Sequence, residues 1–544
     1  MTVRPSSFVA TLARLVCAPV AGYVLSQAFP PRGWGWLAPI AVMAFTVSVW
    51  RRSAWSGFLL GALFGLAFFL PLISWMRVVG DDAWFMLSLL CAFWAAVTGA
   101  LIALVTRLPL WPLWAATCWV AVETVRDRIP WGGFAWGRLA FSQSDSPFAF
   151  LAAIAGAPLV TFTVALLGSL LAAGVLHLAP ALAGEPRWGA RPARSPGLAA
   201  VDLVLIVAVL LAGLASSAVT VLPQPGTEKA VTAAVIQGNV PRAGLGTEGP
   251  PGQILDNHIA ATRELARLVR QGSQQQPELV IWPENASDID PYTHPGAAVD
   301  ISSTVDDIGA PVLVGAVVTN PDNPDTVLNL GIVWKPGTGP GEWYAKRHPV
   351  PFGEYIPMRP LISRLIDRFA LIPHDFAAGQ VPGVLTLGPA RIGDVICFEV
   401  ADDEVVRDAV TGGGHLLVVQ TNNATYGHTG QPEQQLAITR LRAIEHARAT
   451  LVAATSGISA IMTSRGDITQ QLPEFVAGSL VSEVIQSDSL TLSDRVGSKP
   501  EWALTLIAAL AVLWALMSRR LGSNERGRAG GRTSDDFAQE NEQP

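Results

Sequence analysis

Residues 391–400 read Arg-Ile-Gly-Asp-Val-Ile-Cys-Phe-Glu-Val, and we expect the rest of the chain to serve this stretch. The run Asp394-Val395-Ile396 predicts a strand buried in a sheet, with Cys397 at its end. Asp402-Asp403-Glu404 then predicts the acidic first turn of a helix. A cysteine at such a junction is held on a rigid element and can act as a nucleophile. The alternative is a small core residue, because free cysteine is among the most buried residue types.

The whole chain is more apolar than a soluble protein of its size. Of its 544 residues 50% are hydrophobic, 15% are charged and 18 are Trp. The apolar residues are concentrated in separate segments, which favours a membrane protein with an additional polar domain. A net charge of −6, without a basic patch interleaved with aromatic residues, argues against nucleic acid as a partner.

Eight apolar segments are predicted to span a bilayer, which requires about 20 residues per helix. They are Phe8–Ala28, Trp34–Trp50, Ala54–Trp75, Ala83–Thr106, Leu108–Glu123, Pro147–Leu178, Leu198–Val221 and Trp502–Ser518. The second and fifth are short, so seven spans is the alternative count. A signal peptide is the alternative for the first segment, but similar segments follow it at once and no cleavage site stands out.

Arginines in the short loops predict the orientation. When the spans alternate, Arg51-Arg52, Arg107, the group Arg187, Arg191 and Arg194, and the C-terminal tail fall on one side, which should be the cytoplasm. Both termini are then cytoplasmic. The predicted organisation is a membrane domain over 1–222, an extracytoplasmic catalytic domain over 223–500, a last span over 501–519 and a disordered cytoplasmic tail over 520–544.

The long polar region is predicted to be an α/β domain, because strand and helix patterns alternate along it. Helices are expected at Ile254–Arg270 and Gln431–Arg448. Strands are expected at Ala230–Gln237, Leu279–Trp282, Pro311–Val318, Val327–Trp334, Trp343–Ala345, His415–Gln420, Thr450–Ala454 and Ser459–Thr463. This order predicts a layered sheet with helices on its outer face.

Cys397 is the only cysteine of the polar region, since Cys17, Cys91 and Cys118 lie in apolar segments. The region therefore cannot form an internal disulfide, and a lone thiol in an oxidising compartment favours a reactive role. The eight His residues show no ligand spacing and no Gly-rich phosphate loop stands out, so neither a metal nor a cofactor is predicted. His348 is expected to pack or to form hydrogen bonds.

Three further charged residues stand at strand or loop ends. Glu284 and Lys346 each follow an apolar strand, and Glu354 closes the rigid segment Pro349–Glu354. Taken singly, each could be a solvated charge or half of a Lys–Glu ion pair. Charged residues at strand ends converge where ligands bind. A Glu can take the proton of a thiol, and a Lys can stabilise the oxyanion of a carbonyl under attack.

Glu, Lys and Cys in this order resemble the nitrilase superfamily, whose triad lies on an αββα sandwich. Trp282-Pro283-Glu284, Tyr344-Ala345-Lys346 and Ile396-Cys397-Phe398-Glu399 look like its three motifs. Within that superfamily the chain resembles the membrane-embedded branch, the apolipoprotein N-acyltransferases, in which the catalytic domain lies between membrane spans. Four other segments are similar to that branch, namely Val350–Glu354, Gln237–Pro241, Arg440–Glu445 and Trp136–Gln143.

The resemblance implies a ping-pong acyl transfer in a bacterial plasma membrane, the last step of lipoprotein maturation. Cys397 would attack the sn-1 ester of a phospholipid and carry the acyl chain as a thioester. The α-amine of a diacylglyceryl-cysteine at the N-terminus of an apolipoprotein would then accept the chain. Glu284 would be the general base, and Lys346 would stabilise the oxyanion. The phospholipid, the apolipoprotein and the bilayer are the implied partners.

The resemblance also implies residues that bind substrate. Glu354 and Glu399 would orient the lysine or the attacking amine. Asn329 is expected in the pocket, with a turn-capping role as the alternative. Phe398 stands where the family often has Tyr, so a hydroxyl contact is lost there. Trp136 is expected in a loop at the membrane interface with Trp34, Trp36 and Trp131, where simple anchoring is the alternative. The arm Pro241–Pro251 is Gly-rich and lacks the family's usual aromatic residue.

Two other functions are compatible with parts of the sequence. The first is a membrane-tethered amidase of the same superfamily, in which water accepts the acyl group. The second is a scaffold, since some related actinobacterial proteins are fused to or associate with a polyprenyl-phosphate mannose synthase. An intact triad favours an enzyme, because a scaffold does not require Glu284, Lys346 and Cys397 at three strand ends.

Overall fold

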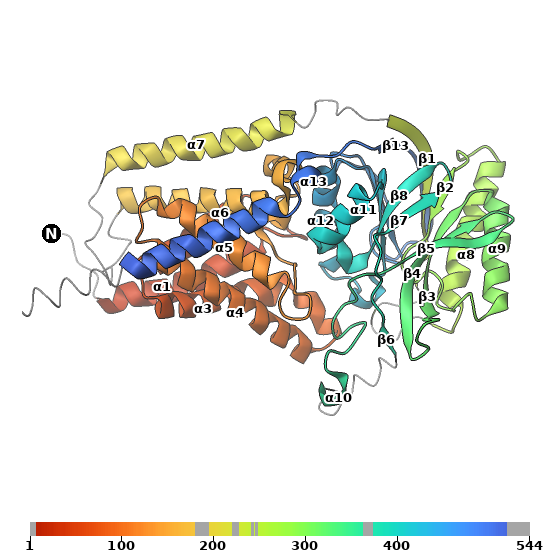
Figure 1. Ribbon diagram of the computed structural model, residues 1–544, viewed down its shortest axis with the longest axis horizontal. Helices are drawn as coiled ribbons and strands as arrows, with labels where there is room; N and C mark the ends of the chain where they lie inside the picture. Colours follow the sequence, from red (N-terminus) through yellow and green to blue (C-terminus); the bar gives the residue numbers. More distant parts are fainter. Residues whose placement is uncertain are drawn as a thin grey trace, which may run out of the picture.

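The computed structural model describes residues 7–179, 195–219, 228–240, 244, 249–362 and 374–518. It has two parts in contact, a bundle of long helices and an α/β domain (Figure 1). The predicted tail, the loop with Arg187, Arg191 and Arg194, and most of the arm Pro241–Pro251 lie outside the described residues.

In the described part, a helix lies over each of the eight apolar segments. These are α1 (Ser7–Ser26), α2 (Leu37–Val49), α3 (Ala54–Leu72), α4 (Asp81–Val105), α5 (Trp111–Arg126), α6 (Ala152–Leu178), α7 (Pro196–Val219) and a C-terminal helix, Lys499–Ser518. Within the described ranges, five helices are long and apolar enough to cross a membrane, namely Ala54–Leu72, Asp81–Val105, Pro147–Leu178, Pro196–Ala218 and Lys499–Ser518. A membrane helical region is therefore supported, and the number of spans stays a prediction.

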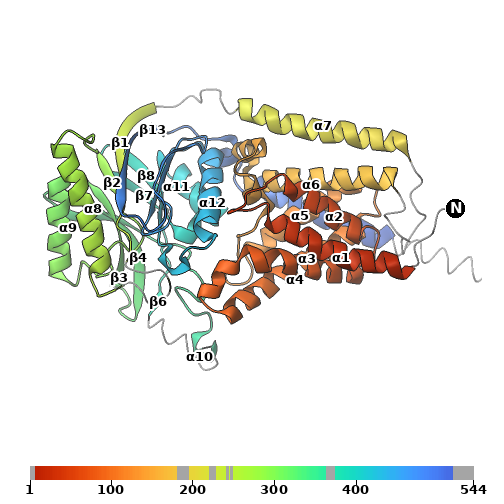
Figure 2. The ribbon, with the colours of Figure 1, turned by 180° about the vertical axis from the view of Figure 1, so that it is seen from behind.

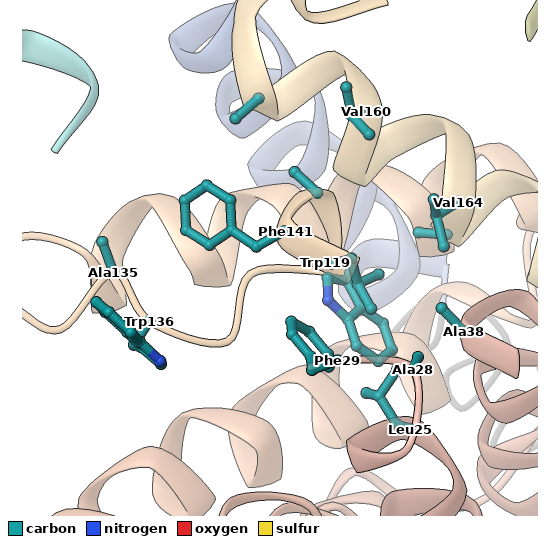
Figure 3. Packing of buried hydrophobic residues seen from close by; sticks show 14 of the residues in the cluster. Leu25, Ala28, Phe29, Ala38, Trp119, Ala135, Trp136, Phe141, Val160 and Val164 are labelled. Carbon is teal, nitrogen blue, oxygen red and sulfur yellow. The ribbon is translucent and has the colours of Figure 1, made fainter. Parts of the chain in front are cut away.

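Small residues allow the bundle helices to approach closely. A Cβ atom added to Gly57 of α3 would lie 2.4 Å from the carbonyl oxygen of Gly99 on α4. Such contacts replace the hydrophobic driving force that is missing between helices in lipid. Elsewhere in the bundle, large side chains fill the interior, among them Phe29, Trp119 and Phe141 (Figure 3).

The described residues of the α/β domain form two sheets. The first has the order β13-β1-β2-β3-β4-β5, with β6 paired to β4, and the second has the order β12-β11-β10-β9-β8-β7. The first comprises β1 (Glu228–Gln237), β2 (Leu279–Ile281), β3 (Val312–Thr319), β4 (Thr326–Lys335), β5 (Gly339–Ala345), β6 (Asp375–Phe376) and β13 (Gly478–Ser487). The second comprises β7 (Val384–Leu387), β8 (Ala390–Ile396), β9 (Leu416–Thr421), β10 (Thr450–Ala454), β11 (Ala460–Met462) and β12 (Ile468–Gln471).

The two sheets lie face to face between two layers of helices. Helices α8 (Gln253–Arg270) and α9 (Pro295–Ile308) cover the first sheet, and α11 (Asp403–Thr411) and α12 (Gln431–His446) cover the second (Figure 2). Buried apolar side chains from both sheets meet between them, including Val235, Ile281 and Val418. The layer of α11 and α12 faces the helical bundle (Figure 1). The prediction of an α/β sandwich joined to a membrane helical region is confirmed.

The sequence patterns missed several elements of this domain. The most important is β13, which pairs antiparallel with β1 from Glu228↔Ser487 to Gln237↔Gly478 and forms one edge of the first sheet. Strands β6, β7 and β12 and helices α9, α10 (Arg359–Ile362) and α13 (Leu492–Val496) were also not predicted. The predicted strands are present, with ends shifted by a few residues.

A buried cluster of charges joins the bundle to the α/β domain. Arg138, in the loop after α5, pairs with Asp403 at the start of α11 at 2.7 Å. Arg442 of α12 pairs with the same carboxylate and donates to the carbonyl oxygens of Val400 and Ala401. Both arginines are buried. The turn that follows Cys397 is thereby tied to the loop Arg126–Ser146 of the bundle.

We expect Asp403→Asn to lower the free energy of unfolding by about 3 kcal/mol, since removing one partner of a buried ion pair leaves uncompensated charge. Burial opposes ionisation of Asp403, but Arg138 and Arg442 outweigh it and lower the pKa of this carboxyl. The stabilisation is therefore present above the unfolded pKa of about 3.9 and is lost as pH falls through the lower folded pKa. Thermal unfolding in detergent at neutral and acid pH measures the effect.

Glu404, the exposed residue next to Asp403, provides the control for this prediction. Glu404→Gln, at an exposed position of the same helix, should leave the melting temperature unchanged. A melting temperature of Asp403→Asn equal to that of the wild type at neutral pH would contradict the stabilising role of the cluster.

Candidate active site

Cys397 lies at the predicted junction between a strand and a turn. It follows β8 directly and begins a 3-10 turn, η6 (Cys397–Ala401). Its φ of 54° lies in the left-handed region, which residues other than glycine rarely adopt. Such strain is concentrated at functional sites. Cys397 is partly exposed, whereas Cys91 and Cys118 are buried among the bundle helices.

The thiol of Cys397 carries its proton in the resting site. Burial, followed by the negative charge of Glu284, raises the pKa of this thiol to about 12, although Lys346 opposes the shift. The hydroxyl of Thr421 donates to the sulfur at 3.3 Å. A base must therefore remove the proton as the sulfur attacks, because the thiolate is the nucleophile.

Glu284 follows β2 and is buried with three donors around its carboxylate. Oε1 accepts from Asn329 Nδ2 at 2.7 Å and from Lys346 Nζ at 3.2 Å. Oε2 accepts from the backbone N–H of Asn422 at 2.8 Å. The neighbouring strand approaches so closely that a Cβ atom on Gly315 would lie 2.0 Å from the carbonyl oxygen of Pro283. Only glycine fits there, so Gly315 fixes the path of the chain into Glu284.

Lys346 lies at the end of β5, between two carboxylates. Its Nζ donates to Glu284 Oε1 at 3.2 Å and to Glu354 Oε1 at 2.9 Å. Burial disfavours the ammonium, but the charges of Glu284 and Glu354 outweigh it and raise the pKa of Lys346 well above its usual range. Lys346 is therefore a permanent cation beside the thiol, and its charge in turn affects the pKa of Cys397.

Glu354 and Asn329 complete this cluster. Glu354 Oε2 accepts from the backbone N–H of Val350 at 2.6 Å, which holds the Pro-rich segment against the lysine. Asn329 lies inside β4, and its Nδ2 also donates to Glu354 Oε1 at 3.2 Å. The turn-capping alternative for Asn329 was therefore wrong. Its amide is a second donor, beside Lys346, to the same two carboxylates.

Glu399 is buried, and both of its carboxylate oxygens accept hydrogen bonds from backbone N–H groups. Oε1 accepts from the backbone N–H groups of Arg347 at 2.6 Å and His348 at 3.0 Å, and Oε2 from that of Ile396 at 2.8 Å. The Tyr344 hydroxyl lies within 3.0 Å of both oxygens. This carboxylate ties the segment after Lys346 to the turn of Cys397, and its predicted contact with substrate stays a prediction.

Phe398 and Trp136 stack on each other, with ring centroids 5.2 Å apart. Trp136 is 1% exposed, whereas Trp34, Trp36 and Trp131 are 47%, 65% and 45% exposed. Of the four tryptophans expected to lie in interfacial loops, Trp136 differs because it packs inside the protein, next to Ala135 in Figure 3. Its contact with Phe398 places it beside the residue that follows the nucleophile.

A cavity of about 350 Å³ lies next to this stack. Its walls come from both parts of the molecule and include Trp131 of the bundle loop and Val350 and Phe398 of the α/β domain. Arg347 and His348 also line it, and Asp402 pairs with His348 at 2.9 Å and raises the pKa of that imidazole. A largely apolar cavity with a few charged groups is typical of a ligand site.

Sequence reasoning missed the polar residues at the end of β9. Gln420 Nε2 donates across the two sheets to the carbonyl oxygen of Trp282 at 2.6 Å, Thr421 contacts the sulfur, and Asn422 holds Glu284. Gln420 and Thr421 end the buried strand β9, and Asn422 and Asn423 follow it directly; polar residues at the end of a buried strand were the signal that could have identified them.

A cysteine, a glutamate and a lysine at strand ends of an αββα sandwich define a nitrilase-type cysteine enzyme, here joined to membrane helices. The sequence profile of carbon-nitrogen hydrolases matches residues 232–491, and that of the apolipoprotein N-acyltransferase N-terminal domain matches residues 21–170. The chain belongs to the apolipoprotein N-acyltransferase family, and it is an acyltransferase.

Two relatives illustrate the extent of the match. A Mycolicibacterium smegmatis protein named apolipoprotein N-acyltransferase is 38% identical over 517 residues, covering 91% of this chain and 85% of that protein. A Photobacterium profundum protein of the same name is 28% identical over 525 residues, covering 91% of this chain and 95% of that protein. Among solved structures, an amidase from Nesterenkonia AN1 of the nitrilase superfamily aligns with 52% of this chain and 98% of its own, at 16% identity and a TM-score of 0.36.

Proposed function

We propose that this chain transfers an acyl chain from a membrane phospholipid to the α-amine of a diacylglyceryl-cysteine at the N-terminus of an apolipoprotein. The proposal rests on one observation, the thiol of Cys397 beside the buried pair of Glu284 and Lys346, in a chain whose relatives are named apolipoprotein N-acyltransferases. The acyl chain is carried on Cys397 as a thioester.

In the first half-reaction, Glu284 takes the thiol proton while Cys397 Sγ attacks the sn-1 ester carbonyl carbon. Negative charge develops on the carbonyl oxygen, and the Lys346 ammonium stabilises it. The carbon–oxygen bond to glycerol then breaks, and Glu284 returns the proton to the glycerol oxygen. Lysophospholipid leaves, and the thioester remains.

In the second half-reaction, the neutral α-amine of the acceptor attacks the thioester carbonyl carbon. Glu284 takes a proton from the nitrogen, and Lys346 again faces the oxyanion. The carbon–sulfur bond breaks, and the sulfur recovers the proton from Glu284. The products are the amide on the acceptor and the free thiol, so the enzyme returns to its starting state.

Both substrates are lipids, which fits a site held against a helical bundle. We place the α/β domain (223–500) on the extracytoplasmic side of a bacterial plasma membrane and both termini in the cytoplasm, following the arginine-rich loops. Residues 1–222 and 501–519 then form the membrane domain. The exposed side chains of Trp34, Trp36 and Trp131 support a position of their loops at a membrane interface, because Trp is enriched at both interfaces.

The transfer is tested with the full chain in phospholipid nanodiscs and a synthetic diacylglyceryl-cysteine peptide. We expect the peptide to gain the mass of one acyl chain, and no gain with Cys397→Ala or with a peptide whose α-amine is acetylated. Release of free fatty acid without peptide acylation would contradict the transfer and favour the amidase. Association with a polyprenyl-phosphate mannose synthase is a separate prediction, which co-purification tests.

A further inference from the structure

Two adjacent glutamines in the first turns of α12 contact different parts of the molecule. Gln434 contacts segments of the helical bundle, and Gln435 contacts the turn that carries the nucleophile. Both side chains are buried. One helix therefore touches the membrane part and the reacting part of the protein through consecutive residues.

Gln434 uses its whole amide on the bundle. Its Oε1 accepts from the indole N–H groups of Trp136 at 2.7 Å and Trp75 at 3.1 Å. Its Nε2 donates to the carbonyl oxygens of Leu72 at 3.0 Å and Pro30 at 3.1 Å. Three segments of the bundle that are distant in the chain, at Pro30, Leu72–Trp75 and Trp136, thus meet at one side chain of the α/β domain.

Gln435 holds the nucleophile. Its Nε2 donates to the carbonyl oxygen of Cys397 at 3.3 Å and to the hydroxyl of Thr421 at 3.0 Å. That hydroxyl lies 3.3 Å from the sulfur. Gln435 therefore links α12 directly to Cys397, while Arg442 of the same helix binds the end of the same turn.

The aromatic contacts form a second connection between the same two parts. Trp136, fixed by Gln434, stacks on Phe398, which directly follows Cys397. Trp75, the other indole held by Gln434, packs edge-on against Tyr426 with centroids 5.0 Å apart. Tyr426 ends the short turn that follows Thr421 and Asn422. The two indoles that Gln434 holds therefore contact the residue after Cys397 and the turn after Thr421, the residue that donates to the sulfur.

We propose that Gln434 is a positioning residue that sets the nucleophile against the bundle, so that Cys397 meets an ester presented by the bilayer. Gln434 has no hydrogen bond to Glu284, Lys346 or Cys397 among the described residues. Its loss should therefore impair access of the lipid and leave the chemistry of the thiol intact. This role of Gln434 rests on the proposed acyl transfer, because it couples the nucleophile to the membrane helices.

The test compares two acyl donors on the same protein in phospholipid nanodiscs. One donor is the phospholipid of the bilayer, and the other is p-nitrophenyl butyrate, a small ester that reaches the thiol from water. The variants are Gln434→Leu, which loses all four hydrogen bonds, and Gln434→Glu, which keeps an acceptor for the two indoles. The control is Gln486→Leu in β13, since Gln434 and Gln486 are both 5% exposed.

We expect Gln434→Leu to slow acylation of Cys397 by phospholipid at least about tenfold, because four buried polar groups lose their partner. Butyrylation by the soluble ester should match the wild type. Gln434→Glu should recover part of the loss, and Gln486→Leu should behave as wild type with both donors. Equal loss with both donors, or no loss with phospholipid, would overturn the inference. A wild-type protein that phospholipid does not acylate would contradict the proposed function instead.

Discussion

Glu284→Gln is expected to slow acylation of Cys397 by about 10²–10⁴-fold, the usual contribution of a general base. Glutamine keeps the shape of the side chain but cannot accept the proton of a thiol whose pKa is raised to about 12. The rate is measured by intact mass, as the fraction of protein carrying an acyl chain against time after mixing with phospholipid.

A second reagent separates the two effects of Glu284 on the thiol. Its negative charge helps to raise the pKa of Cys397, so its removal by itself makes the thiolate easier to form. Alkylation by iodoacetamide needs only the thiolate and should therefore be unchanged or faster in Glu284→Gln. A matched control is Glu483→Gln, at an exposed position of β13. If alkylation and acylation slow together, Glu284 does not act as the base.

Lys346→Met should lower acylation by about 10²–10³-fold, the typical cost of removing one donor to an oxyanion. Methionine has a similar length but leaves the carboxylates of Glu284 and Glu354 without the cation between them. Burial and the charge of Glu284 already raise the pKa of Cys397, and Lys346 opposes them. Without Lys346 the pKa of this thiol should rise further.

For Lys346→Met, therefore, we expect slower alkylation by iodoacetamide as well as slower acylation, in contrast to Glu284→Gln. The opposite responses of the two variants distinguish the base from the cation. Lys335→Met, at the exposed end of β4, is the matched control. A folded Lys346→Met variant that retains wild-type acylation would exclude a role for this ammonium at the oxyanion.

The positions of Cys397, Glu284 and Lys346 at strand ends could be predicted, because the three residues together are more informative than any one of them alone. Asp394-Val395-Ile396 forms the end of β8, and Cys397 follows it at a turn, as the pattern indicated. Glu284 and Lys346 were found because each charge follows an apolar strand, and the structure joins them by a hydrogen bond. The local pattern of apolar residues indicates where a strand ends, so reactive side chains at strand ends can be recognised from the sequence.

Contacts between distant segments could not be predicted in this way. The pairing of β13 with β1 joins residues some 250 positions apart. A pattern of alternating apolar and polar residues in Gly478–Ser487 can indicate a strand, but it does not show which strand it pairs with. Trp136 is buried and donates to Gln434, which lies about 300 positions further along the chain. Asn329 shows the same limit, because its bonds to Glu284 and Glu354 arise only when three strands or loops meet.

The thioester on Cys397 is the central claim, and its direct detection is the most decisive measurement. Wild type and Cys397→Ala are incubated with phospholipid and analysed by intact mass, with and without hydroxylamine, which cleaves thioesters. We predict an adduct of one acyl chain on the wild type that hydroxylamine removes, and no adduct on Cys397→Ala. An unmodified wild type, under conditions in which a known apolipoprotein N-acyltransferase is acylated, would contradict the account.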